Sequence, residues 1–316
     1  MKIRPHFELS VRGRKVQLGA RTLIMGVLNA TPDSFSDGGI YLDPAAAIAR
    51  GVEMVRQGAD WIDVGGESTR PGSRPVSAEE EAARVLPVIK GLRRKLPSVP
   101  ISIDTTKADV AEQAVETGAA ILNDVSGLRF DPRLAEVARQ SGAPLILMHI
   151  RGRPMDMQRR PFARSIWRSV EEGLERSIER ALASGVRRSQ LILDPGLGFG
   201  KTRAQNFEIL AHLDRLQRFR LPVLVGSSRK SFVRAIVRGE GLTPKPARKG
   251  KTAGNMFPGD SASLAALQFG DAAAVVAAII SGAHIVRVHD VEQILPAVRI
   301  ADAVTLAGGR GAPSKS

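Results

Sequence analysis

Residues able to bind a ligand or move a proton stand directly after a series of short apolar runs. Among them, Asp104 and Asp194 can each accept two parallel N–H bonds from the edge of a flat heterocycle. Lys230 can donate to a ring oxygen or nitrogen, and Arg287 can stack on a planar ring while it bonds to the ring's edge. The complete set is Asn29, Glu67 to Arg70, Asp104, Asn123 with Asp124, His149, Asp194, Ser227 to Lys230, and Arg287 with His289. Such a set suits a flat heterocycle joined to an anion.

Each of these residues also has a structural interpretation. Asp194 precedes a proline and a glycine and could simply form a turn. Asp104 could equally cap the helix that follows it, and Asn123 with Asp124 could be ordinary loop polarity. His149 is better explained as a buried histidine at the rim of the fold than as a catalytic group. The functional interpretation rests on the whole set, since every apolar run ends in polar residues.

The apolar runs alternate with longer segments of helical spacing, a pattern typical of a parallel sheet. Eight such runs predict an α/β protein with a closed (β/α)8 TIM barrel, whose sites lie at the carboxyl ends of the strands. We therefore expect the polar residues to share one mouth. The runs are 23–28, 61–64, 101–103, 121–122, 145–148, 191–193, 223–225 and 285–288, and the clearest helical segments are 45–57, 78–94, 110–117, 165–183 and 207–218.

Three segments fall outside this alternation. Residues 1–20 contain an alternating stretch that turns at Arg12 and Gly13, which predicts a β-hairpin closing the N-terminal mouth of the barrel. Residues 239–260 are rich in Gly, Pro, Lys and Arg and predict a long basic inserted loop before the last helix–strand unit. Residues 308–316 predict a flexible tail. The barrel is then expected over 21–307.

Bulk composition narrows the possible functions. A barrel of this kind needs about 250 residues, so the 316-residue chain accommodates one barrel with added segments. The net charge of +14 is compatible with anionic substrates; because the basic residues are spread along the chain without an RNA-binding motif, no nucleic-acid partner is expected. The chain has no cysteine, which excludes disulfides and thiolate metal sites. Without an apparent signal peptide or an apolar span, it is expected to be cytoplasmic, with no membrane association.

At these residues the sequence resembles the dihydropteroate synthase family. The segment MGVLNATPDSFSDGG, 25–39, is similar to the first signature of that family, and DVGGESTRPG, 63–72, is similar to the second. Further similar segments follow in family order, so that the resemblance spans 25 to about 302. They are 102–105, 123–127, 148–149, 194–201, 228–231 and 285–290.

The resemblance implies a TIM-barrel transferase of folate biosynthesis. Such an enzyme joins p-aminobenzoate to 7,8-dihydropterin-6-ylmethyl diphosphate, releases pyrophosphate, uses Mg²⁺, forms a homodimer and is a target of sulfonamides. The residues it implies for catalysis are Asn29, Thr69, Arg70, Lys230, Arg287 and His289, with Asn29 as the Mg²⁺ ligand. Those it implies for substrate binding are Asp33, Ser34, Phe35, Thr69, Pro71, Asp104, Asn123, Met148, Asp194, Phe199, Gly226, Lys230, Ser231, Arg287 and His289.

Within that set the resemblance divides the work. Asp104, Asn123, Asp194 and Lys230 would hold the pterin, with Arg287 stacked on it. Met148 would lie beneath the ring, while Arg287 and His289 would bind phosphate oxygens. The p-aminobenzoate pocket would consist of Phe35, Thr69, Pro71, Phe199 and Ser231.

The chain also departs from the family pattern. Gln205 stands where the family usually has histidine, and it could touch the edge of the site or only cap a helix. The segment 239–260 is longer than usual, and Arg151 and Arg153 add charge near the mouth. Two alternatives remain open: a pterin-dependent methyltransferase, which would lack the motifs at 31–35 and 68–71, and a non-catalytic pterin-binding paralogue.

Overall fold

The computed structural model describes residues 4–31, 43–69, 72–159, 161–243 and 263–309. Within them, eight parallel strands form one sheet in the order β8-β7-β6-β5-β4-β3-β10-β9, and a parallel bridge between Leu193 and Val223 joins its two edges. The predicted (β/α)8 barrel is thereby confirmed. The strands are β3 (Leu23–Asn29), β4 (Trp61–Gly65), β5 (Ile101–Asp104), β6 (Ile121–Asp124), β7 (Leu145–Met148), β8 (Leu191–Asp194), β9 (Leu224–Val225) and β10 (Ile285–Val288).

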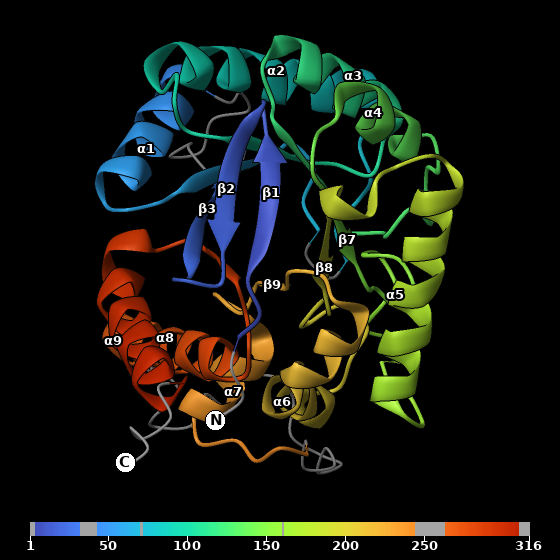
Figure 1. The fold of residues 1–316 in the computed structure, drawn as a ribbon. Helices are drawn as coiled ribbons and strands as arrows, with labels where there is room; N and C mark the ends of the chain where they lie inside the picture. Colours follow the sequence, from blue (N-terminus) through green and yellow to red (C-terminus); the bar gives the residue numbers. More distant parts are fainter. Residues whose placement is uncertain (1–3, 32–42, 70–71, 160, 244–262, 310–316) are drawn as a thin grey trace, which may run out of the picture.

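Helices surround the barrel on the outside (Figure 1). Side chains directly before several of them accept backbone N–H bonds: Asp43 caps α1, Ser77 caps α2 and Ser263 caps α8. These caps explain why α1, α2 and α8 begin where they do. The helices are α1 (Pro44–Arg56), α2 (Ala78–Lys95), α3 (Ala108–Thr117), α4 (Leu134–Ser141), α5 (Ile166–Ala183), α6 (Arg203–Ala211), α7 (Ser231–Val237), α8 (Leu264–Ile280) and α9 (Val291–Gly309), with 3-10 turns η2 (Arg188–Gln190) and η3 (Leu213–Phe219).

An antiparallel hairpin of β1 (Phe7–Val11) and β2 (Arg14–Leu18) lies across one end of the barrel (Figure 1). Its turn places both Arg12 and Gly13 at positive φ, 51° and 74°, as a tight two-residue hairpin turn requires. Its buried side chains pack against residues from the amino-terminal parts of the strands, among them Met25, Trp61 and Ile121. The hairpin therefore closes the N-terminal mouth, as predicted, and leaves the carboxyl ends of the strands for a site.

Two sequence predictions need correction. The helix expected over 207–218 is wrong: α6 begins earlier, at Arg203, and ends at Ala211, and the 3-10 turn η3 follows it. The early start comes from Thr202, which accepts a bond from the Gln205 backbone N–H in a capping box. Helix α9 extends to Gly309, beyond the start of the expected tail at 308. Of the expected insertion at 239–260, the part beyond 243 lies outside the described residues.

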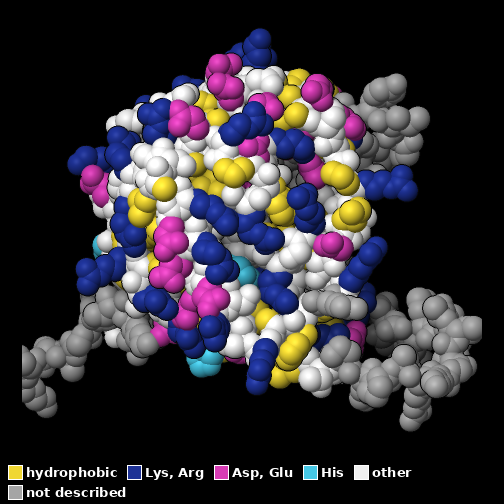
Figure 2. Space-filling model, turned by 90° about the vertical axis from the view of Figure 1, so that its right-hand side faces the viewer, with side chains coloured by type: hydrophobic (Ala, Val, Ile, Leu, Met, Phe, Trp, Pro, Cys, Tyr) yellow, Lys and Arg dark blue, Asp and Glu magenta, His cyan; other side chains and the backbone are white. Residues whose placement is uncertain are grey.

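Charged side chains of both signs are intermixed on the face that carries α5 (Figure 2). Several form ion pairs within or next to that helix, including Arg168 with Glu172 and Arg215 with Glu171. On this face, the excess of basic residues is therefore dispersed among acidic ones. Among the described residues, none of the helices combines the length and apolar character needed to cross a membrane.

Candidate active site

Strand alternation places a set of polar side chains inside the barrel at its carboxyl end. On β4, Ile62 and Val64 pack outward against the helices, so Trp61 and Asp63 face the interior. Trp61 packs with the hairpin at the closed end, and Asp63 lies nearer the open end. The same alternation turns one polar side chain each of β5, β6, β8 and β10 into the interior near the open end. These positions, with the lysine that follows β9, form what we call the polar cluster: Asp63, Asp104, Asn123, Asp194, Lys230 and Arg287.

Arg287 is the central cation of the polar cluster. Its Nε donates to Asp63 Oδ2 at 2.6 Å, and its Nη2 donates to Asp104 Oδ2 at 2.7 Å. Asn123 Nδ2 donates to the same oxygen of Asp63 at 2.9 Å. The buried carboxylate of Asp63 thus joins β4 to β10 and β6, and Arg287 joins β10 to β5 through Asp104.

Asp63 was missed as a site residue by the sequence analysis, because it falls inside the run 61–64 that was taken as a simple apolar strand. Its side chain is fully buried, at 0% exposure. A charged residue within a buried strand is rare unless it is paired. That signal, together with the shared interior face of Trp61 and Asp63, was available in the sequence.

Asp104 does not cap a helix: the N-cap position of α3 belongs to Lys107, whose side chain makes no capping bond. The capping interpretation of Asp104 is therefore wrong. Burial raises the pKa of Asp104 to about 7, although the nearby Arg287 acts in the opposite direction. Asp63 and Asp124 add to the rise through like-charge repulsion. The carboxylate thus sits in an environment that favours a bound hydrogen-bond donor.

Asp194 combines the turn role and the interior position that the sequence left as alternatives. Its Oδ1 accepts a bond from the Gly196 backbone N–H at 2.7 Å, which fixes the turn after β8. Burial raises its pKa to about 6, and the positive charges of Lys230, Lys201 and Arg287 oppose the rise. The Asp194 carboxylate therefore lies within the electrostatic influence of Lys230 and Arg287.

Lys230 extends over an aromatic ring at the edge of the polar cluster. Its Nζ lies 4.2 Å from the centroid of the Phe199 ring. Burial lowers the pKa of Lys230 to about 8, and Arg287 lowers it further while Asp194 and Asp104 act in the opposite direction. Phe199 packs with Met148 and Val125 in a small apolar cluster. The flat ring of Phe199 and the cationic Nζ of Lys230 therefore border the same part of the barrel mouth.

A second lysine, Lys201, organises the loop after β8. Its buried Nζ donates to the carbonyl oxygens of Gly196 at 2.7 Å, and of His149 and Phe199, both at 3.1 Å. Burial lowers its pKa to about 7. This role of Lys201 is not predictable from the sequence, because the three carbonyl groups become neighbours only when the loop is folded.

Other polar residues of the same loops have structural roles. The His149 ring is buried, with Nε2 3.4 Å from Ser169 Oγ, and burial lowers its pKa well below the usual value, in keeping with the structural interpretation. Asp124 accepts bonds from the Ser126 and Leu128 backbone N–H groups and shapes the loop after β6. Gln205 completes the cap of α6 and bonds to the backbone of Ala163, so it does not touch the polar cluster.

The remaining residues implied by the resemblance are distributed around the mouth. Asn29 ends β3 and Thr69 follows β4, both half-buried, and Ser231 is exposed at the start of α7. Gly226 follows β9, where a Cβ would lie 3.8 Å from Arg287 Cβ. The His289 Nδ1 atom lies 3.3 Å from Ser228 Oγ, just beyond β10. The residues Asp33, Ser34, Phe35, Arg70 and Pro71 lie outside the described residues.

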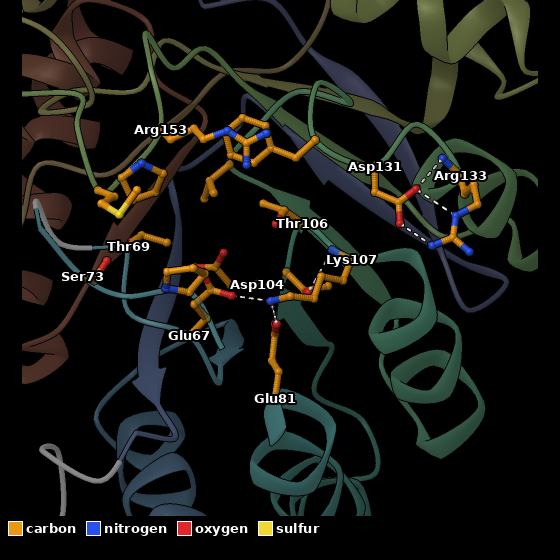
Figure 3. Close-up of a pocket in the computed structure, with 16 residues that line it drawn as sticks. Glu67, Thr69, Ser73, Glu81, Asp104, Thr106, Lys107, Asp131, Arg133 and Arg153 are labelled. Carbon is orange, nitrogen blue, oxygen red and sulfur yellow. Dashed lines mark hydrogen bonds and ion pairs between the residues drawn. The ribbon is translucent and has the colours of Figure 1, made fainter. Parts of the chain in front are cut away.

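A cavity of about 510 Å³ opens beside the polar cluster (Figure 3). It lies among the loops that follow β4, β5 and β6 and is lined by Asp104, Thr69, Val125, Phe130 and the 153–155 segment. Neither Asp194, Lys230 nor Arg287 lines it. The cavity therefore adjoins the polar cluster on the Asp104 side, where it could receive a second molecule.

The described residues contain no group of three or more His, Asp or Glu side chains placed to hold a metal ion. A divalent cation would need ligands from elsewhere, such as a bound diphosphate. Mg²⁺ commonly takes one or two protein oxygens and completes its shell with phosphate oxygens and water. The amide of Asn29, at the carboxyl end of β3, fits such a substrate-linked site.

Comparison with known proteins agrees with this geometry. A profile of the pterin binding enzyme family matches residues 25–289. A dihydropteroate synthase from Synechocystis is 43% identical over 286 residues, which cover 90% of this chain and 91% of that protein. Two solved structures, both dihydropteroate synthases, are similar over most of their length. The Xanthomonas albilineans enzyme with 4-aminobenzoic acid has a TM-score of 0.80 at 36% identity, covering 95% of this chain and 98% of that one.

The second is a Yersinia pestis enzyme in complex with a sulfonamide drug, with a TM-score of 0.81 at 38% identity, covering 95% of this chain and 100% of that one. The family profile extends over all the strands that carry the polar cluster. The chain therefore belongs to the dihydropteroate synthase family of pterin-binding enzymes, and it is a transferase with dihydropteroate synthase activity.

Proposed function

We propose that the polar cluster holds the pterin ring of 7,8-dihydropterin-6-ylmethyl diphosphate and that p-aminobenzoate approaches it from the adjoining cavity. The observation that carries this proposal is the convergence of Asp104, Asn123, Asp194, Lys230 and Arg287 on one buried mouth. These residues come from five different strands or their following loops. A barrel built only for stability would not need buried charges from so many strands at one end.

The aminopyrimidinone edge of a pterin offers parallel N–H donors next to a carbonyl oxygen. Asp194 offers a buried carboxylate to such donors, with Oδ1 already fixed by the Gly196 N–H. Asn123 and Asp104 supply an amide and a second carboxylate on the neighbouring strands β6 and β5. Lys230 would donate to a ring oxygen or nitrogen from the opposite side. The pairing of donors and acceptors would then fix the ring in one orientation.

The flat faces of the ring need apolar and cationic neighbours. Met148 and Phe199 belong to one buried apolar cluster and would support one face of the pterin. Arg287 would stack on the other face, since its guanidinium is already held flat by Asp63 and Asp104. We assign Asp63 the role of orienting Arg287 rather than of binding substrate.

The diphosphate would lie near Arg287 and His289, which follow each other on and after β10. Asn29, at the end of the adjacent strand β3, would ligate Mg²⁺ together with diphosphate oxygens. When bound, Mg²⁺ neutralises charge on the departing pyrophosphate. Arg287 and His289 would contribute to the same effect through hydrogen bonds that strengthen as negative charge develops.

p-Aminobenzoate would bind between Thr69, Ser231 and Phe199, together with Phe35 and Pro71, which lie outside the described residues. Thr69 lines the cavity next to Asp104. An arylamine is already nucleophilic when neutral, so attack on the methylene carbon needs no strong general base. The protein's main contributions would be to position the amine and to exclude water. The C–N bond then forms as the C–O bond to pyrophosphate breaks, and the amine releases a proton.

The test is pyrophosphate release measured with both substrates, for the wild type and for Asp194→Ala. We expect the variant to lose pterin affinity by more than about a hundredfold, since a charged acceptor for two donors is removed. A matched control is Asp109→Ala, which removes an exposed carboxylate that pairs with Arg133 on the outside of the barrel. Unchanged pterin affinity of Asp194→Ala in calorimetry would contradict the assignment.

A pterin-dependent methyltransferase would bind the same ring without p-aminobenzoate. The named relatives and the bound 4-aminobenzoic acid of the Xanthomonas albilineans enzyme favour the synthase instead. The Yersinia pestis enzyme is known with a sulfonamide drug. We accordingly expect sulfonamides to compete with p-aminobenzoate here, and kinetics without such competition would count against the proposed second-substrate site.

We further propose that the chain forms a homodimer through α8 and α9. These two helices pack against each other and expose large apolar side chains, with Leu264 74%, Phe269 75% and Ile300 66% exposed. Sedimentation of the double variant Phe269→Glu/Ile300→Glu should shift the species to a monomer. Phe162→Glu, at a 68% exposed position elsewhere, should leave it unchanged. A wild type that sediments as a monomer would refute the dimer. A cytoplasmic location stays a prediction.

A further inference from the structure

One charged group beside the polar cluster has no role in the mechanism described so far. Lys107 lines the cavity, and its Nζ donates to Glu67 Oε2 and to Glu81 Oε2 (Figure 3). The side chains of Lys107 and Glu67 are 24% and 23% exposed, whereas that of Glu81 is only 1% exposed. We call these three residues the lysine clamp. A cation shared by two carboxylates at this depth needs a structural reason, because isolated charges are costly to bury.

The lysine clamp joins three separate elements. Glu67 is the second residue after β4 and stands two residues before Thr69. Glu81 lies in the first turn of α2, the helix that ends the same connection. Lys107 lies three residues after Asp104, at the N-cap position of α3. The clamp therefore ties both ends of the β4–α2 connection to the loop that carries Asp104.

The framework on which the clamp acts is fixed by backbone pairing. Gly65 of β4 lies opposite Asp104 of β5 in the parallel register. The connections after β4 and β5 therefore begin at the same level, and they lead to Glu67 and to Lys107, respectively. The position of Thr69 relative to Asp104 is set by these short paths and by the ion pair that joins them.

Additional bonds hold the same segment without reaching the Asp104 loop. Arg84 Nη1 donates to Gly66 O at 2.8 Å, and Ser73 Oγ donates to Ser68 O at 2.5 Å. Those contacts shape the connection internally. Lys107 links the segment across to the β5–α3 loop through its bonds to Glu67 and Glu81.

The charge balance makes the ammonium essential to this link. Burial raises the pKa of Glu81, and the hydrogen bond from Lys107 opposes that rise. Glu67 and Glu81 repel each other when both are ionised. Removing the cation would leave two carboxylates facing each other in a partly buried site, so at least one would have to turn away or take up a proton.

We propose that Lys107 is a positioning residue for p-aminobenzoate, which fixes Thr69 relative to Asp104 and so aligns the arylamine with the pterin. This inference rests on the roles proposed above for Thr69 and Asp104. Lys107 itself touches neither reacting atom. Its effect is transmitted through Glu67, which stands two residues before Thr69.

The test compares Lys107→Met with the wild-type enzyme in steady-state kinetics and calorimetry. We expect KM for p-aminobenzoate to rise by about tenfold or more, as for the loss of one charge-assisted contact. The dissociation constant for the pterin should stay within about twofold, since the polar cluster is intact. Lys107→Arg should restore KM to within about threefold, because a guanidinium can still serve two carboxylates.

A matched control is Lys15→Met, which breaks a lysine–glutamate pair with Glu8 in the hairpin at the opposite end of the barrel. It should change neither constant. Hydrogen exchange supplies a readout independent of activity: amides at 66–69 and 73–77 should exchange faster in Lys107→Met, with α5 unchanged. If that variant does not fold, Glu67→Gln is measured in its place, with the same shifts expected.

The proposal fails if KM and the pterin constant change by the same factor, or if neither changes. Thr69→Ala, measured in parallel, separates this failure from failure of the proposed function. If Thr69→Ala raises KM for p-aminobenzoate and Lys107→Met does not, the clamp is overturned and the site assignment stands. If Thr69→Ala leaves KM unchanged, the assignment of Thr69 to the second substrate is wrong, and the clamp proposal falls with it.

Discussion

Removing the charge of Asp63 should impair the enzyme although Asp63 is not expected to touch either substrate. Its Oδ2 accepts from Arg287 Nε at 2.6 Å and from Asn123 Nδ2 at 2.9 Å. The change Asp63→Asn keeps the size of the side chain and removes its negative charge. Arg287 would keep its bond to Asp104, so the guanidinium would be held at one side only.

The magnitude follows from the kind of bond that is weakened. A hydrogen bond to a charged group contributes about 1.5–3 kcal/mol, against about 1 kcal/mol for a neutral pair. Replacing the carboxylate by an amide should therefore weaken the interaction that holds Arg287 in place by about 1–2 kcal/mol. If that placement supports the transition state, kcat/KM falls by about five- to thirtyfold. Asp63→Ala should do more harm, with about 3–5 kcal/mol of lost stability, because it leaves a buried guanidinium partly unpaired.

The assay is pyrophosphate release at saturating p-aminobenzoate, with urea unfolding measured in parallel to establish that Asp63→Asn is folded. Asp60→Asn provides the control: Asp60 precedes the same strand and pairs with Arg21 at the closed end of the barrel. It should leave kcat/KM unchanged. A folded Asp63→Asn enzyme with wild-type kcat/KM would refute the argument that Asp63 orients Arg287.

Three further predictions concern the buried ionisable groups. Burial raises the pKa of Asp194 to about 6 and lowers that of Lys230 to about 8. Pterin affinity measured by calorimetry should therefore fall below pH 6, where the Asp194 acceptor is protonated, and above pH 8, where the Lys230 cation is lost. An affinity that does not change with pH would contradict both roles. Asp194→Asn should raise the free energy of unfolding at pH 7 by up to about 3 kcal/mol. The sign follows from the raised pKa of Asp194: below pH 4 the carboxyl is protonated in both states, and as pH rises to 6 ionisation increasingly destabilises the folded wild type. If the variant and the wild type differ in free energy of unfolding by the same amount at pH 4 and pH 7 in urea, the prediction is wrong. Lys201→Met should destabilise the fold by about 2–4 kcal/mol, since three buried carbonyl oxygens lose their donor; unchanged urea midpoints would show that the loop holds without it.

The sequence allowed the barrel and most of the polar cluster to be predicted because both depend on local periodicity. A two-residue repeat turns alternate side chains into the barrel, so a polar interior residue near the end of a strand lies at the carboxyl end, and parallel strands bring those ends together. Asp104, Asn123, Asp194 and Arg287 follow this rule. Asp63 obeys it as well, but it was hidden because an apolar run was treated as uniform and not by alternate faces.

Other features could not be predicted from local pattern. In the lysine clamp, Lys107 meets Glu81, 26 residues away in sequence, and Glu67, 40 residues away, and the three residues belong to three elements. Which of several glutamates meets a lysine depends on helix placement, which periodicity does not determine. Similarly, the end of α6 at Ala211 depends on tertiary packing beyond the cap at Thr202. Long-range partners are therefore the part of the site that requires coordinates.

The loop after β8 folds closely around the Lys201 ammonium, so few substitutions are tolerated in it. A methyl group on Gly196 would lie 2.0 Å from the His149 carbonyl oxygen, and one on Gly200 would lie 2.3 Å from that of Arg151, both at positive φ. Relatives that keep this loop must keep glycine at both positions. Mutations that alter drug or substrate preference in such an enzyme are therefore expected to appear at the rim near Thr69, and this wall of the proposed pterin pocket should stay constant as they accumulate.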